Sequence, residues 1–170
     1  MPALLPALLL GLVAVGCGYA LVGRGSNIPE SVEAVYLEAL VNRTQRSQVD
    51  QFLTRAIADE LTTRRLFDLL GGPEGADAVL KGSVENFAVT PITFDNQGLA
   101  REYEISITAK MSFVEIGTDE VIWSNDRYLF RENYVVEEVG TNYLDRENDA
   151  IERAAENFAE TMVSDLLEGF

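Results

Sequence analysis

Residues 102–113 of this chain read EYEISITAKMSF, and every second residue of the stretch is apolar. Successive side chains of a strand point to opposite faces of its sheet, so the stretch predicts a strand with one apolar and one polar face. This alternation is typical of an antiparallel sheet that covers a core on one side only. The rest of the fold must therefore supply elements that cover the apolar face.

Three further strands are predicted around this one. Residues 121–134 follow a short turn and predict an antiparallel hairpin with 103–113. Residues 78–93 predict a strand before it, with an irregularity near Asn86, where the alternation changes phase. The spaced valines and leucines of 31–40 predict the first strand of the chain.

Two amphipathic helices are predicted, over residues 47–67 and 144–167. Apolar residues recur in both at the i, i+3, i+4, i+7 spacing of a helix with one buried stripe. We expect Ser47 to cap the first helix and 71–73, which read GGP, to end it. The expected stripe of the second helix consists of Ile151, Ala154, Ala155, Phe158, Met162 and Leu166.

The order strand, helix, three strands, helix predicts an α+β fold (β-α-β-β-β-α). We expect a four-stranded, mostly antiparallel sheet with the two amphipathic helices packed on one face. Residues 31–170 suffice for a single domain with one core.

The amino-terminal residues predict a lipid anchor. Residues 4–15 are almost all apolar and lead to Cys17, the single cysteine of the chain. The run is shorter than the about 20 residues of a membrane-spanning helix and fits the core of a signal peptide. We expect 1–16 to be a signal peptide, Cys17 to carry the lipid, and 17–30 to be a tether.

This anchor predicts a location. Two or three acyl chains hold a protein firmly on a bilayer, whereas one chain does so only marginally. Gly18, rather than aspartate, follows the cysteine, and this favours the outer membrane, with the domain on the periplasmic face. A single cysteine also allows no disulfide within the chain.

Composition argues against several classes of function. The chain has 28 acidic and 13 basic residues, a formal net charge of −15, and this disfavours nucleic acid as a partner. It has no histidine, which removes Ser-His-Asp and Cys-His catalysis and most zinc sites. We expect no enzyme activity, no metal site and no cofactor.

Two pairs of charged residues are candidate sites. Glu60 and Arg64 fall within the apolar stripe of the first helix, four residues apart, so they can pair. Either the helix end leaves the core and both reach water, or they form a polar contact point for a partner or a lipid headgroup. Glu102 and Glu104 share one strand face about 7 Å apart, which suits either a solvated face or a catalytic carboxylate pair.

Short motifs spread over the chain resemble the LptE family of lipopolysaccharide-assembly lipoproteins. Each motif is short, and their order along the whole mature chain carries the resemblance. They are CGY at 17–19, IP at 28–29, NRT at 42–44, ADAVLKG at 76–82 and GTDEVIW at 117–123.

The resemblance implies a two-helix, four-strand fold and a plug role inside the outer-membrane barrel LptD. There the family helps to assemble the barrel and assists the passage of lipopolysaccharide to the cell surface. Arg101 and Lys110, which bracket the strand of 102–113, are candidates for a lipopolysaccharide headgroup contact. Two alternatives stay open: a ligand-binding or secretion-system accessory lipoprotein that faces the periplasm, and a carboxylate-dependent hydrolase acting on envelope glycans.

Overall fold

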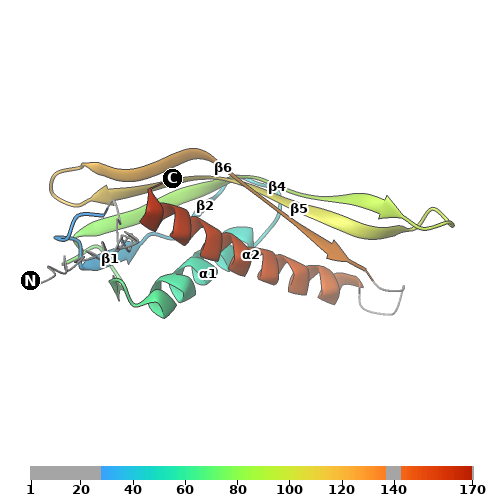
Figure 1. Ribbon diagram of the computed structural model, residues 1–170, viewed down its shortest axis with the longest axis horizontal. Helices are drawn as coiled ribbons and strands as arrows, with labels where there is room; N and C mark the ends of the chain where they lie inside the picture. Colours follow the sequence, from blue (N-terminus) through green and yellow to red (C-terminus); the bar gives the residue numbers. More distant parts are fainter. Residues whose placement is uncertain (1–27, 137–142, 170) are drawn as a thin grey trace, which may run out of the picture.

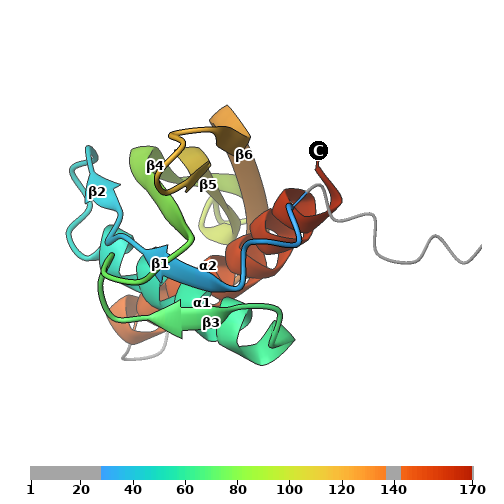
Figure 2. The same cartoon turned by 90° about the vertical axis from the view of Figure 1, so that its left-hand side faces the viewer.

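The computed structural model describes residues 28–136 and 143–169, in which two helices lie against one side of a single sheet (Figures 1 and 2). The predicted α+β class is confirmed. The elements are β1 (Ala34–Leu37), β2 (Val41–Asn42), α1 (Val49–Arg64), β3 (Asp68–Leu70), β4 (Ala78–Phe94), β5 (Ala100–Glu115), β6 (Val121–Val135) and α2 (Tyr143–Glu168).

Strand β5 lies between β4 and β6 and pairs antiparallel with both. Its predicted apolar face is buried, since Ile105, Ile107 and Met111 are at most 1% exposed. The predicted irregularity in β4 is a register shift between Val84 and Asn86. The long hairpin of β4 and β5 extends past the ends of both helices (Figure 1).

The prediction of four strands was wrong, because the sheet has six. The two unforeseen strands are short: β2 pairs in parallel with β4, and β3 pairs in parallel with β1. Strand β1 lies between β3 and β4 and is parallel to both. Helix α1 thus lies on the connection between the parallel strands β1 and β3, which need a long crossover.

Helix α1 is shorter than predicted at both ends. It starts at Val49 after Gln48, which adopts a left-handed conformation (φ 67°) and makes no side-chain cap, so the predicted Ser47 cap was wrong. It ends because Arg65 is also left-handed (φ 52°), with its N–H donating to the carbonyl of Thr62. The chain therefore leaves the helix before Asp68 and can form β3, and the glycines at 71 and 72 do not end the helix.

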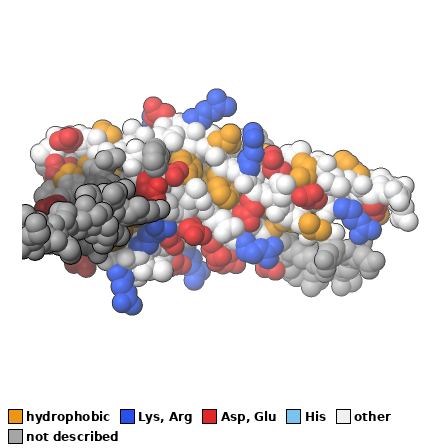
Figure 3. Space-filling model, in the orientation of Figure 1, with side chains coloured by type: hydrophobic (Ala, Val, Ile, Leu, Met, Phe, Trp, Pro, Cys, Tyr) orange, Lys and Arg blue, Asp and Glu red, His pale blue; other side chains and the backbone are white. Residues whose placement is uncertain are grey.

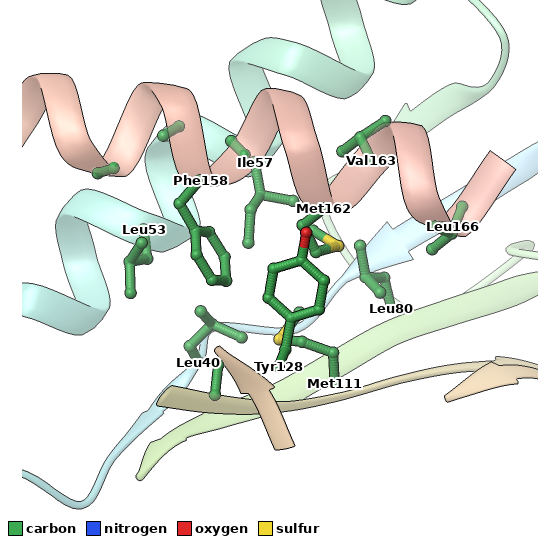
Figure 4. Close-up of a cluster of buried hydrophobic side chains, with 14 of the residues drawn as sticks. Leu40, Leu53, Ile57, Leu80, Met111, Tyr128, Phe158, Met162, Val163 and Leu166 are labelled. Atoms are coloured by element: carbon green, nitrogen blue, oxygen red, sulfur yellow. The ribbon is translucent and has the colours of Figure 1, made fainter. Parts of the chain in front are cut away.

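The core lies between the sheet and the two helices (Figure 4). Phe158 of α2 is fully buried and packs edge-on against Tyr128 and Phe130 of β6, at ring centroid distances of 5.4 and 5.9 Å. The Tyr128 hydroxyl donates a hydrogen bond of 2.8 Å to Asp165, which ties β6 to α2. Burial and this carboxylate raise the pKa of Tyr128. The whole predicted stripe of α2 is buried.

Gly82 of β4 lies where two strands approach closely. It pairs with Met111 of β5, and a Cβ atom at Gly82 would lie 2.3 Å from the Lys110 carbonyl and 2.6 Å from the Met111 sulfur. No side chain fits in that space without displacing the neighbouring strand.

Candidate functional site

The predicted lipid attachment residue, Cys17, lies outside the described residues, as do the signal peptide 1–16 and most of the tether 17–30. They remain predictions. In the ranges 28–136 and 143–169, neither helix is long and apolar enough to cross a bilayer.

The Glu60–Arg64 pair forms as predicted and lies between the helices. Arg64 Nε donates to Glu60 Oε1 at 2.6 Å, and the two side chains are 30% and 21% exposed. The Arg64 guanidinium also donates to Ser164 Oγ of α2 at 2.7 Å. The pair therefore joins α1 to α2, and a role in contacting a partner stays a proposal.

Arg101 and Lys110 do not share a site. They are nine residues apart on β5, about 30 Å along the strand. Arg101 Nε donates to Asp95 at 3.0 Å in the β4–β5 loop, whereas Lys110 pairs with Asp126 of β6 at 2.7 Å. In the loop, the hydrogen bond that the backbone N–H of Leu99 donates to Asp95 is the main cause of the lowered pKa of this carboxyl group.

The carboxylates of Glu102 and Glu104 each bind a different neighbour. Glu102 accepts hydrogen bonds from Thr93 at 2.9 Å and from Asn133 at 3.3 Å. Glu104 lies 3.8 Å from Arg131. This arrangement is a set of cross-strand contacts on a solvated sheet face. In the described part of the chain, no three acidic or cysteine side chains gather to hold a metal ion.

Sequence reasoning missed a basic patch on the polar face of the sheet, formed by Lys81, Lys110 and Arg127. Lys81 pairs with Ser112 and Ser83 pairs with Lys110, so the two lysines are diagonal neighbours on β4 and β5. Arg127 lies in the bulge of β6 opposite Lys110. Only the strand register brings these residues together, so no local sequence motif could have revealed the patch.

Two motifs that carry the family resemblance build loops. The side-chain amide of Asn42 donates to the Arg46 carbonyl at 2.8 Å, and its oxygen accepts from the Thr44 N–H at 2.9 Å. Asp77 accepts hydrogen bonds from the N–H groups of Glu33 and Ala34, at 3.0 and 2.8 Å, and these bonds lower its pKa. Both motifs therefore position strand ends next to β4.

The protein is a small α+β domain, in which two helices cover one side of a six-stranded sheet. The other side of the sheet is polar and is left uncovered by the two helices. Solved structures show the same fold. Examples are a candidate lipoprotein from Caulobacter crescentus CB15 (20% identity, TM-score 0.53) and protein CT253 from Chlamydia trachomatis (10% identity, TM-score 0.56). The matches cover 76% and 82% of this chain, and 88% and 98% of those chains.

A third similar structure is the PelC dodecamer from Paraburkholderia phytofirmans, at 15% identity and a TM-score of 0.52, covering 80% of this chain and 89% of that chain. At these identities the similarity shows the fold alone. The family is shown by sequence: the family model LptE, lipopolysaccharide-assembly, matches residues 32–166, and the chain belongs to this family. A search of curated proteins finds no significant match.

Proposed function

We propose that this protein is a non-enzymatic outer-membrane lipoprotein that plugs the LptD barrel, helps to assemble it, and so assists lipopolysaccharide transport to the cell surface. The observation that carries the proposal is the LptE family match over 32–166, a range that includes every strand, the whole of α1 and most of α2. It favours this function over the secretion-system accessory role, for which the structural similarity offers only a shared fold.

The fold suits a plug in physical terms. Its core is continuous from sheet to helices, and cross-links such as Tyr128–Asp165 and Arg64–Ser164 tie the layers together. A rigid domain loses little conformational freedom when it enters a partner, so more of the interaction energy remains for binding. Acylation at Cys17 would hold the domain at the membrane where the barrel is assembled.

Two experiments test this function. The first is affinity purification of the tagged protein from native envelopes, in which we expect a large β-barrel to be recovered with it. The second is depletion, which we expect to reduce lipopolysaccharide at the cell surface. Recovery as a free monomer after gentle solubilisation would contradict the proposal.

The anchor is tested separately with Cys17→Ser. We expect radiolabelled palmitate to appear on the wild-type protein and to be lost from the variant, and the wild-type protein to fractionate with the outer membrane. Label on the variant would show that the lipid is attached elsewhere.

A further inference from the structure

One part of the polar face of the sheet carries a local cluster of basic side chains. The chain has only two lysines, Lys81 and Lys110, and the fold makes them diagonal neighbours next to Arg127. All three are exposed, and Asp126, paired with Lys110, is the one acidic residue among their immediate β6 neighbours. In the described part of the chain, neither Lys81 nor Arg127 has an acidic partner within 4 Å. On β4 the nearest carboxylate, Glu85, binds Ser83 and is paired with Arg43 at 3.6 Å. With Asp126 and Glu85 counted, the patch keeps a local excess of positive charge in a protein of net charge −15.

The opposite side of the molecule carries a row of acidic residues on α2, together with exposed arginines such as Arg55 and Arg153. The exposed side of α2 carries Glu152, Glu156 and Glu160 at four-residue spacing, which places like charges next to each other. The helices lie on one side of the sheet (Figures 1 and 2). Lys110 alternates along β5 with the buried Ala109 and Met111, so the basic patch is on the other side. Basic side chains project at the upper margin of Figure 3, on the sheet side of the molecule. Both signs of charge occur on both sides of the molecule, and α2 is the more strongly acidic element.

From this local excess of positive charge we infer that the basic patch docks on an acidic protein surface, namely an acidic region of the wall of the proposed barrel partner. The inference rests on the proposed function and adds which face meets that wall. Complementary charge sets the orientation of docking and the rate of encounter more than the raw affinity. It would fix how an otherwise rigid plug is turned within its partner.

The geometry favours carboxylates over the phosphate of a lipid headgroup. A phosphate site gathers converging donors, often backbone N–H groups at a turn or a helix start. Here the side chains stand side by side on the open face of the sheet, and the backbone of β5 is engaged in pairing with both neighbouring strands. Ser112 and Ser124, paired across β5 and β6, add hydroxyls to the same face. Charges and hydroxyls that are spread over neighbouring strands, without converging on one point, match several separate carboxylates on a protein surface.

The test uses the full tagged chain with Lys81→Glu and Lys110→Glu together. We expect about tenfold less barrel to be recovered in the affinity purification, as is typical when interfacial charge pairs are reversed. We also expect recovery by the wild-type chain to fall as salt rises, because salt screens exposed charges. Thermal melting followed by circular dichroism checks that the variant is folded.

The matched control is Arg55→Glu with Arg153→Glu, which changes the net charge equally but at exposed positions on the helices. We expect it to recover barrel as the wild type does. If both double variants lose barrel recovery equally, net charge alone is responsible and the inference is overturned. If the lysine variant recovers as much barrel as the wild type, the basic patch does not contact the barrel, and this result also overturns the inference. A loss of bound lipopolysaccharide with unchanged barrel recovery would also overturn it. A wild-type chain that recovers no barrel would contradict the proposed function itself.

Discussion

At the scale of single residues, Gly82 is the glycine of the described residues at which an added Cβ would lie closest to another strand's backbone. Gly82→Ala places a Cβ against the Lys110 carbonyl and the Met111 sulfur, so β4 and β5 must separate. We expect a loss of about 1–3 kcal/mol in the free energy of unfolding, measured by urea denaturation. Gly71→Ala is the control, because a Cβ there meets nothing within 4 Å, and we expect a change within about 0.5 kcal/mol. An equal loss of stability in both variants would show that the loss of a glycine matters, and not the close approach of β4 and β5 at Gly82.

Asp77 makes a pH-dependent contribution to stability. Hydrogen bonds from the Ala34 and Glu33 N–H groups lower its pKa in the folded protein below the ordinary value of 3.8. A group with a lowered folded pKa stabilises the protein above its unfolded pKa, and this contribution is lost as the pH falls towards the folded pKa. We therefore expect Asp77→Asn to be less stable than wild type at neutral pH, with the difference shrinking below about pH 4.

The measurement for Asp77 is urea denaturation at a series of pH values. Asp68→Asn, an exposed position on β3, is the control and should show a smaller difference. A difference between Asp77→Asn and wild type that stays constant down to about pH 2 would contradict the assigned hydrogen bonds.

At the scale of elements, α1 and α2 are joined by polar contacts as well as by their buried stripes. Arg64→Ala removes the donor to Ser164 and leaves Glu60 without its partner. We expect a loss of about 1–2 kcal/mol, because hydrogen bonds of a charged group in a half-buried position are worth about that much.

Arg55→Ala is the control for Arg64, since its pair with Asp59 is 80% and 75% exposed and should contribute within about 0.5 kcal/mol. A double-mutant cycle with Ser164→Ala isolates the contact between the helices. A coupling energy near zero in that cycle would mean that Arg64 acts within α1 alone.

The long elements were predictable from sequence and the short ones were not. The period-2 pattern of 102–113 predicted β5, and the stripe of α2 predicted residues that are all buried, because both elements bury one face along their length. Strand β3 was hidden, since Leu66 and Phe67 continue the apolar character of α1, and only the left-handed Arg65 ends the helix. Strand β2 has two residues and is defined by pairing with β4.

The candidate sites were less predictable than the fold. The Glu60–Arg64 pair follows from helical spacing, but its third partner, Ser164, is 100 residues distant from Arg64 in sequence. Lys110 was noted without its neighbours Lys81 and Arg127, which depend on the register of two hairpins and on a bulge in β6. Contacts between distant segments depend on the exact strand register, which the β-bulges of β4 and β6 shift and which no short sequence motif marks.

At the scale of the whole molecule, a net charge of −15 opposes folding through self-repulsion. Raising NaCl from about 10 mM to about 150 mM shortens the screening length from about 30 Å to about 8 Å. We expect the melting temperature to rise by about 2–4 °C, measured by calorimetry, which corresponds to about 1 kcal/mol. Sucrose at matched osmolality is the control; a fall in melting temperature with salt would mean that ion pairs outweigh repulsion.

The projecting hairpin of β4 and β5 has a consequence for how this family can diversify. Its loop closes on itself through Asp95, Leu99 and Arg101, and its distal part extends past the helices. Residues can therefore be inserted or deleted there in matched pairs, one on each strand, without disturbing the packed interior. The length of the projecting hairpin can therefore change during evolution without changing the stability of the domain. The same fold could in this way fit binding partners whose cavities differ in depth.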